Sequence, residues 1–118
     1  MNIEWFRDYC ISLKGVTEEF PFGEETLVFK VMGKMFALTD VDLFTSVNLK
    51  CDPEKAVQLR EQHAAIQPGY HMNKNHWNTV LMDGTLSDKF VKELINDSYT
   101  LVVSGLTKKL KGELEKLP

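Results

Sequence analysis

The chain has 118 residues, of which 43% are hydrophobic and 26% are charged. This length and composition predict one soluble globular domain over residues 1–118 and exclude collagen-like, disordered and membrane-spanning chains. Fourteen Lys and Arg residues against 17 Asp and Glu residues give a formal net charge of −3, which excludes a uniformly basic nucleic-acid-binding protein but permits a local basic surface.

Residues 3–13 are predicted to form an amphipathic helix that packs one face on the core. Apolar side chains recur there at spacings of three and four: Ile3, Phe6, Cys10 and Leu13. Asn2 is a suitable N-cap for this helix. The following segment, 18–25, has no consistent period and contains a proline and a glycine, so we expect a connection that Phe20 and Phe22 anchor to the core.

Three short strands are predicted next, because the chain becomes rich in β-branched and aromatic residues. They span 26–32, 35–39 and 43–49, and Gly33 and Lys34 form a tight turn between the first two. Connections this short join antiparallel neighbours, since parallel strands need a long crossover. The three strands therefore predict an antiparallel meander.

The C-terminal half is predicted to hold two helices and a further strand. The helices span 53–63 and 88–104, and each is preceded by a residue that caps helices well, an aspartate and a serine. A strand over 76–82 lies between them, and 106–118 forms a lysine-rich tail. The predicted fold class is therefore α+β, a two-layer domain in which helices pack on an antiparallel sheet.

Cys10 and Cys51 are the only two cysteines of the chain. Neither lies in a CxxC motif or at metal-ligand spacing from a histidine, so we expect both to be reduced and structural. Charged residues interrupt the apolar pattern near the N-terminus, unlike in a signal peptide, and no apolar run is long enough to span a membrane. We therefore expect a cytoplasmic protein without membrane contact.

The sequence carries no enzyme signature. It lacks a glycine-rich dinucleotide motif, a Walker loop, an HExxH motif and a GxSxG motif. The three histidines, His63, His71 and His76, have no acidic residue placed to complete a metal site. We predict a protein that is not an enzyme and that needs no metal and no cofactor.

Positive charge is concentrated in three segments of a chain that is otherwise acidic. Segments 26–39 and 65–82 contain lysines and no acidic residue, and 106–118 contains four lysines and two glutamates. If the fold brings these segments together, one face suits a phosphate backbone. The candidate nucleic-acid-binding residues are Lys30, Lys34, His71, Asn73, Lys74, Asn75 and His76. A purely structural interpretation is also open, in which the asparagines form turns and Trp77 belongs to the core.

The segment PGYHMNKNHWNTV at 68–80 strongly resembles a stretch typical of the MmcQ/YjbR family of small bacterial proteins. Four further resemblances to that family occur in order along the chain: FPFG at 20–23, KVMGKMFAL at 30–38, LKCDPEKAVQLRE at 49–61 and SYTLVVSGLTKK at 98–109. The resemblance extends over nearly the whole chain, from Phe20 to Lys109.

The resemblance implies the element order α-β-β-β-α-β-β-α, which adds a strand near residues 66–71. Members of the family are commonly described as DNA-binding through a "double wing" fold, in which the sheet and its loops meet the duplex, and no enzymatic activity is implied. The leading prediction is a non-catalytic module that binds DNA weakly and without sequence preference. Two alternatives stay open: a protein-interaction or adaptor domain, and a small-ligand binder near Tyr70, His71 and Trp77.

Overall fold

The computed structural model describes residues 1–69 and 72–118. Its elements, in chain order, are α1 (Ile3–Ser12), β1 (Val16–Glu19), β2 (Thr26–Val31), β3 (Lys34–Asp40), β4 (Ser46–Lys50), α2 (Pro53–Gln62), β5 (Ile66–Pro68), β6 (Trp77–Leu81), α3 (Asp88–Ser104) and α4 (Lys108–Lys116). The predicted fold class and two-layer architecture are confirmed. The observed order contains the predicted one and adds β1 and α4.

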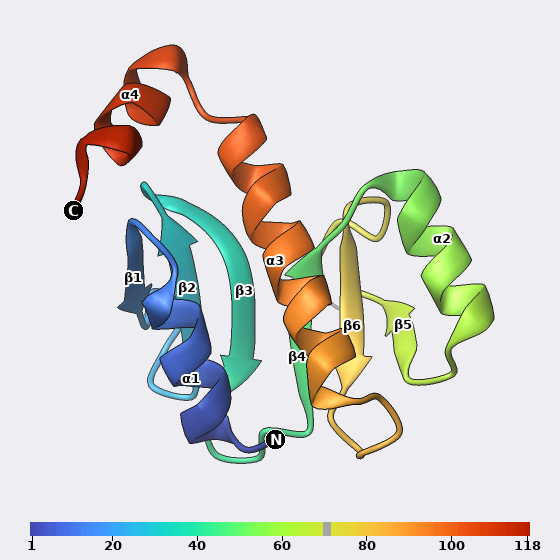
Figure 1. The fold of residues 1–118 in the computed structure, drawn as a ribbon. Coiled ribbons are helices and arrows are strands. Elements are labelled where there is room, and N and C mark those ends of the chain that lie inside the picture. The colour runs from blue at the N-terminus through green and yellow to red at the C-terminus, as the bar shows by residue number, and fades with distance from the viewer. Residues whose placement is uncertain (70–71) are drawn as a thin grey trace.

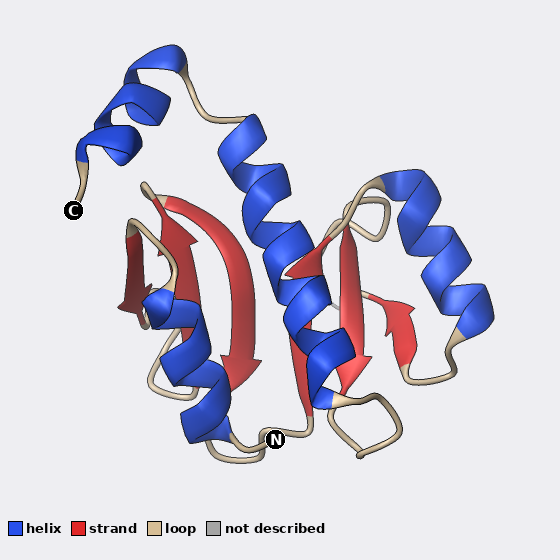
Figure 2. Ribbon diagram, in the orientation of Figure 1, coloured by secondary structure: helices blue, strands red, loops and turns tan. Residues whose placement is uncertain are grey.

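The six strands form one sheet in the order β1-β2-β3-β4-β6-β5, and every neighbouring pair is antiparallel. Helices α1 and α3 lie across one face of this sheet, and α2 lies beside β5 (Figure 1). Figure 2 shows the same separation into a helical layer and a sheet layer. The other face of the sheet, which no helix crosses in these views, is called the open face below.

Polar caps begin the helices where the sequence predicts them. The side-chain oxygens of Asn2, Asp52 and Ser87 each accept a backbone N–H from the first turn of α1, α2 and α3. Between β2 and β3, Met32 and Gly33 both have positive φ angles, 49° and 84°. That combination is typical of the two-residue hairpin turn whose twist matches the flanking strands. A tight turn is therefore present, but it lies one residue earlier than predicted, at Met32 and Gly33, and Lys34 already begins β3.

Strand β1 was not expected, because its sequence VTEE lacks the apolar alternation of a half-buried strand. It forms as the outer neighbour of β2, with Val16 opposite Val31. Its Glu18 accepts two hydrogen bonds from the Arg7 guanidinium on α1, at 2.7 and 2.5 Å. Glu18 lies on the side of this edge strand that faces the helices, and the ion pair explains why a glutamate occurs there.

The predicted strand 43–49 is wrong at its start, since β4 begins at Ser46. Asp40 Oδ1 accepts the backbone N–H groups of Asp42 and Leu43, which turns the chain after β3. Phe44 then has a left-handed φ of 43°, which a strand cannot contain. The strand that the family resemblance implies near 66–71 is present as β5, which ends at Pro68; residues 70 and 71 lie outside the described residues.

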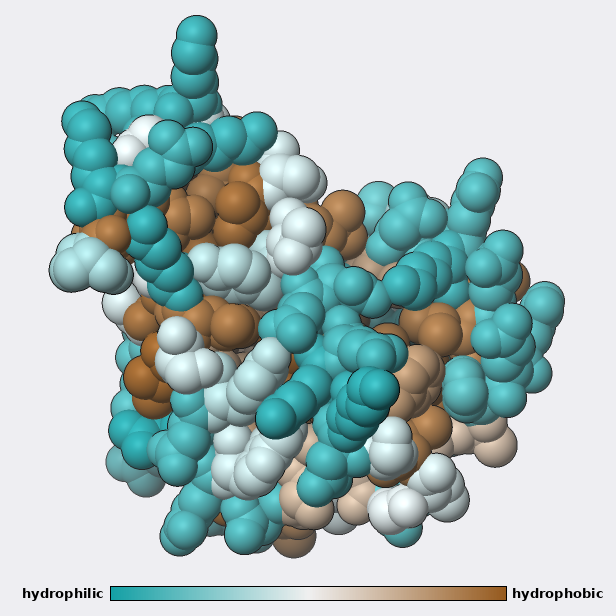
Figure 3. Space-filling view, viewed as in Figure 1, coloured by the Kyte–Doolittle hydropathy of each residue, from teal (hydrophilic) through white to brown (hydrophobic). Residues whose placement is uncertain are grey.

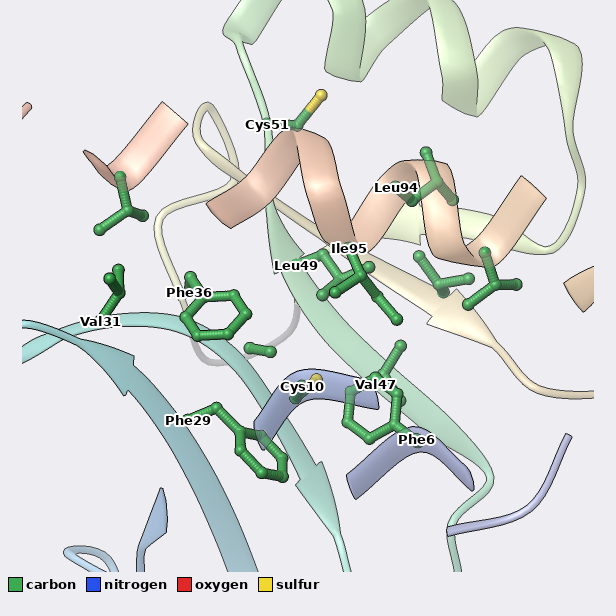
Figure 4. Packing of buried hydrophobic residues seen from close by; sticks show 14 of the residues in the cluster. Phe6, Cys10, Phe29, Val31, Phe36, Val47, Leu49, Cys51, Leu94 and Ile95 are labelled. Atoms are coloured by element: carbon green, nitrogen blue, oxygen red, sulfur yellow. The ribbon is translucent and has the colours of Figure 1, made fainter. Parts of the chain in front are cut away.

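The core lies between the sheet and the helices (Figure 4). Phe6 of α1 meets Phe29 of β2 edge to face, with ring centroids 5.7 Å apart. Ile95 of α3 points from the helix toward Leu49 of β4 in the same view. Such burial of large apolar side chains supplies most of the stability of a domain of this size.

Ser98 of α3 links β3 and β4 at the point where their backbone pairing ends. Register pairs between these strands end at Ala37 and Leu49. Beyond that point the buried Ser98 hydroxyl donates to the Phe36 carbonyl at 2.5 Å and accepts the Lys50 N–H at 2.8 Å. The hydroxyl therefore takes the place of a direct backbone hydrogen bond between the two strands.

The lysine-rich tail forms the helix α4, which returns toward the start of β1. Leu114 is buried and lies directly against Gly15, whose φ is +77°. Lys14 Nζ donates to the Glu115 carbonyl at 3.1 Å. Hydrophilic residues cover much of the helical side of the molecule, while hydrophobic side chains gather beneath α4 (Figure 3). In the described parts of the chain, no helix has the length and apolar character needed to cross a membrane.

Both cysteines are buried and free, and we expect them to react slowly with thiol reagents. Burial raises the pKa of the Cys10 thiol, and it is also the main cause that raises the pKa of Cys51. Because the thiolate is the reactive form, native protein at neutral pH should react with a thiol-specific reagent far more slowly than unfolded protein. Mass spectrometry with and without reductant should show no two-dalton difference. Rapid modification of native protein would contradict this assignment.

Candidate functional site

The open face is defined by the alternation of side chains along each strand. In β4, Val47 and Leu49 face the helices, so Ser46, Asn48 and Lys50 face the other side. Following the register across the sheet places these further side chains on the open face: Thr17, Glu19, Thr26, Val28, Lys30, Met35, Leu38, Asp40, Gln67, Trp77, Thr79 and Leu81.

Lysines gather at one end of this face because the strands alternate in direction. Strand β2 ends, β3 begins, β4 ends and β6 begins at the same end of the sheet, which is the top in Figure 1. This end, called the basic end, carries Lys30, Lys34, Lys50 and Lys74. Helix α3 also ends there and leads into the lysine-rich α4. The three basic segments of the sequence therefore converge.

The opposite end of the sheet is acidic. It contains the residues before β2, after β3 and after β6, together with the start of α3. The carboxylates at this end are Glu24, Glu25, Asp40, Asp42, Asp83 and Asp88. The chain therefore has a charge gradient along its strands, although its net charge is only −3.

A groove of about 530 Å³ lies on the open face between two loops. Its floor comes from β2, β3 and β4, while Phe22 belongs to the β1–β2 connection and Met72 to the β5–β6 connection. The groove is lined by Phe22, Thr26, Met35, Leu38, Thr39, Asp40, Ser46, Asn48 and Met72. It is mainly apolar with a few polar groups, which is the usual character of a ligand site.

A second hollow, of about 330 Å³, lies at the basic end. Lys34 and Lys50 line it together with Trp77 and the last turn of α3. Met35 lines both this basic hollow and the groove. The two hollows therefore adjoin, one with two cationic side chains and the other largely apolar.

The candidate lysines differ in their exposure to solvent and in whether they form a salt bridge. Lys30 Nζ lies 3.1 Å from Glu19 Oε2, and its side chain is only 23% exposed, so much of its charge is neutralised. Lys34 and Lys74 are exposed, and neither has a salt bridge within the described residues. Lys50, which the sequence interpretation omitted, also lies at the basic end and lines the second hollow.

The loop before β6 is held together by its own asparagines. Asn73 Oδ1 accepts the Asn75 N–H at 2.9 Å, and the Asn73 carbonyl accepts the N–H groups of His76 and Trp77. Asn73 therefore acts as a turn former, as the structural interpretation of this loop predicts. The side chains of Asn75, His76 and Lys74 are exposed beside the basic end. The predicted site residue His71, and Tyr70 beside it, lie outside the described residues.

The aromatic residues that the sequence interpretation singled out fall into two groups. Trp77 is only 7% exposed, so it belongs to the packed interior and is not a free stacking surface. The prediction that Phe20 and Phe22 anchor the β1–β2 connection is wrong, because they are 50% and 66% exposed. Phe22 lines the groove, so its exposed ring is available for contact there.

Asn78 of the motif at 68–80 faces the helices, as does Val80, and the buried Asn78 side chain has no hydrogen-bond partner among the described residues. The cavity beside it, lined by Leu49, Cys51 and Asp97 among others, has a volume of about 10 Å³. That is the space of a single water molecule. It is too small for any larger ligand.

Fold and surface together define a class of protein: a small two-layer α+β domain that presents one helix-free sheet face between two loops. The family model YjbR matches residues 11–101, and the chain belongs to the YjbR family. It is 44% identical over 91 residues to the protein YbdF of Escherichia coli O157:H7, covering 76% of this chain and 75% of that protein. It is 33% identical over 118 residues to YjbR of Escherichia coli K12, covering 99% and 100%.

Solved structures agree with this assignment. A Deinococcus radiodurans protein with a DUF419 domain is 44% identical and superposes with a TM-score of 0.90, covering 99% of this chain and 89% of that chain. A Pseudomonas syringae protein is 33% identical with a TM-score of 0.73, covering 86% and 98%. The family and the fold predicted from the sequence are thus both established.

Proposed function

We propose that this chain is a non-catalytic DNA-binding module that contacts the phosphate backbone with the basic end of its sheet. The observation that carries the proposal is the convergence of three basic segments at one end of the sheet. Lys34 and Lys50 line a common hollow there, and Lys74 is exposed on the neighbouring loop. Lysines bind phosphates as point charges, and release of counterions from DNA supplies much of the binding free energy.

The charge gradient also determines the orientation of the complex. The acidic end repels a phosphate backbone, so DNA approaches from the basic end only. Because phosphate contacts carry no sequence information, the contribution of the phosphate backbone to binding is sequence-tolerant. Three or four such contacts correspond to dissociation constants no tighter than about 10⁻⁴–10⁻⁶ M at physiological salt. The exposed side chains at the basic end are lysines, amides and the imidazole of His76, which bind phosphates and sugars without chemical transformation.

The test is fluorescence anisotropy of a short labelled DNA, offered both as a duplex and as a single strand, at low salt where surface charges are least screened. Wild-type protein should bind, and Lys34→Ala combined with Lys50→Ala should weaken binding strongly. For a duplex, the slope of log K against log salt should become about 1.8 shallower, since each lost phosphate contact contributes about 0.9.

The matched control is Lys89→Ala combined with Lys92→Ala. Both control lysines lie on α3 at the acidic end and change the net charge by the same amount. If the control loses as much affinity as the basic-end variant, only net charge matters and the proposed surface is wrong. If neither DNA form binds the wild-type protein at low salt, the proposed function fails, and the protein-interaction alternative replaces it.

A further inference from the structure

We infer that the groove on the open face accepts an unstacked base, so that the preferred partner is a single-stranded nucleic acid whose phosphates lie on the basic end. This inference rests on the proposed function and specifies its ligand. Bases of a duplex are stacked and paired inside the helix, so none of them reaches a groove in a protein surface unless it is flipped out. Single strands present their bases freely to such grooves.

The first argument is the adjacency of the two hollows. Asn48 in the groove and Lys50 in the basic hollow lie two residues apart on one strand and face the same side. Their Cα atoms are therefore roughly 6.8 Å apart. This spacing suits one nucleotide, with the phosphate at Lys50 and the base beside Asn48. Met35, which lines both hollows, forms the surface between them.

The second argument is the lining of the groove. The apolar side chains of Leu38, Met35 and Met72 offer contact to the flat face of a base. Phe22 at the groove has a side chain that is 66% exposed, and an exposed aromatic ring is the usual platform on which a single-stranded base stacks. The volume of about 530 Å³ lies within the range of small-ligand pockets.

The third argument is the position of charge and hydrogen-bonding groups. Asn48 Oδ1 accepts the Thr79 hydroxyl at 2.6 Å, which leaves the Asn48 amide nitrogen as a donor into the groove. Asp40 uses Oδ1 for two backbone N–H groups, and its other oxygen has no partner among the described residues. A carboxylate repels phosphate but accepts a hydrogen bond from the exocyclic amino group of cytosine. The base edge therefore points toward Asp40 and the phosphate away from it.

The decisive comparison uses two labelled single strands with the same number of phosphates, an oligo-dC strand and an abasic strand. Wild-type protein should bind oligo-dC about 5- to 160-fold more tightly, because stacking of one base contributes about 1–3 kcal/mol. Phe22→Ala should remove most of this difference. Phe20→Ala is the matched control, since Phe20 is also an exposed aromatic residue of the same connection but does not line the groove.

A second variant tests the direction of the base. Asp40→Asn keeps the Oδ1 atom that holds the turn after β3 and removes the negative charge. Wild-type protein should prefer oligo-dC to oligo-dT, because thymine has no exocyclic amino group, and Asp40→Asn should reduce that preference. Circular dichroism checks that each variant is folded.

The possible failures are distinguishable. If wild-type protein binds the abasic strand as tightly as oligo-dC, and both still require Lys34 and Lys50, the groove takes no base and the inference is overturned while the proposed function stands. If Phe20→Ala and Phe22→Ala weaken oligo-dC equally, the base stacks outside the groove and the inference is also wrong. If no strand and no duplex binds, the proposed function fails and takes this inference with it.

Discussion

Replacement of Trp77 by alanine should lower the free energy of unfolding by about 3–5 kcal/mol, as removal of a large buried aromatic side chain usually does. Trp77 begins β6, pairs with Lys50 of β4 and is only 7% exposed although it lies on the face that no helix covers. It also packs against the backbone of the β5–β6 connection. A Cβ atom placed on Gly69 would lie 2.8 Å from both Cβ and the carbonyl oxygen of Trp77.

Urea denaturation followed by circular dichroism measures this effect. Trp77→Phe is the control, because it keeps an aromatic ring at the site and should cost clearly less than the alanine variant. If Trp77→Ala leaves the stability unchanged and instead abolishes binding of DNA, Trp77 serves as a contact surface, and its assignment to the packed interior is wrong.

Ser98→Ala should lower the free energy of unfolding by roughly 2–4 kcal/mol, since a buried polar group left without a partner costs about 1–3 kcal/mol. The variant leaves two such groups, the Phe36 carbonyl and the Lys50 N–H. It also removes the link between β3 and β4 beside the basic hollow, which residues of both strands line. We therefore expect weaker DNA binding together with the loss of stability.

Ser104→Ala is the matched control on the same helix. The Ser104 hydroxyl also donates to a backbone carbonyl, that of Leu101, but it is exposed to solvent. Water can replace that bond, so the control should change the stability little. Equal losses of stability for Ser98→Ala and Ser104→Ala in urea denaturation would show that the link between the strands contributes no more than an exposed hydrogen bond.

Helices were the most predictable part of the fold. The apolar period of 88–104 predicts both ends of α3 correctly, because a serine cap starts the helix and a glycine follows it. Strand β1 could not be predicted in the same way, since its glutamates owe their positions to Arg7 and Lys30, which lie elsewhere in the sequence. The start of β4 depends on a side-chain bond of Asp40 that no periodicity reveals.

The site was only partly predictable for a related reason. Local counts of charge identify Lys34 and Lys74, but Lys50 belongs to a segment that is acidic overall. The sequence feature that could have identified Lys50 is the alternation of polar and apolar residues in this strand, where Asn48 and Lys50 alternate with the buried Val47 and Leu49. The groove combines Phe22, Asn48 and Met72 from three distant parts of the chain, and only the order of the strands brings them together.

The borders of the sheet also influence how the protein behaves at high concentration. The outer strands are short, with four residues in β1 and three in β5. Pro68 at the end of β5 has no N–H to offer a further strand, and β1 carries Glu18 and Glu19. A second chain therefore finds no long row of unpaired backbone groups at either border. Sheet growth from molecule to molecule, a common route into aggregates, is disfavoured on both sides of the domain.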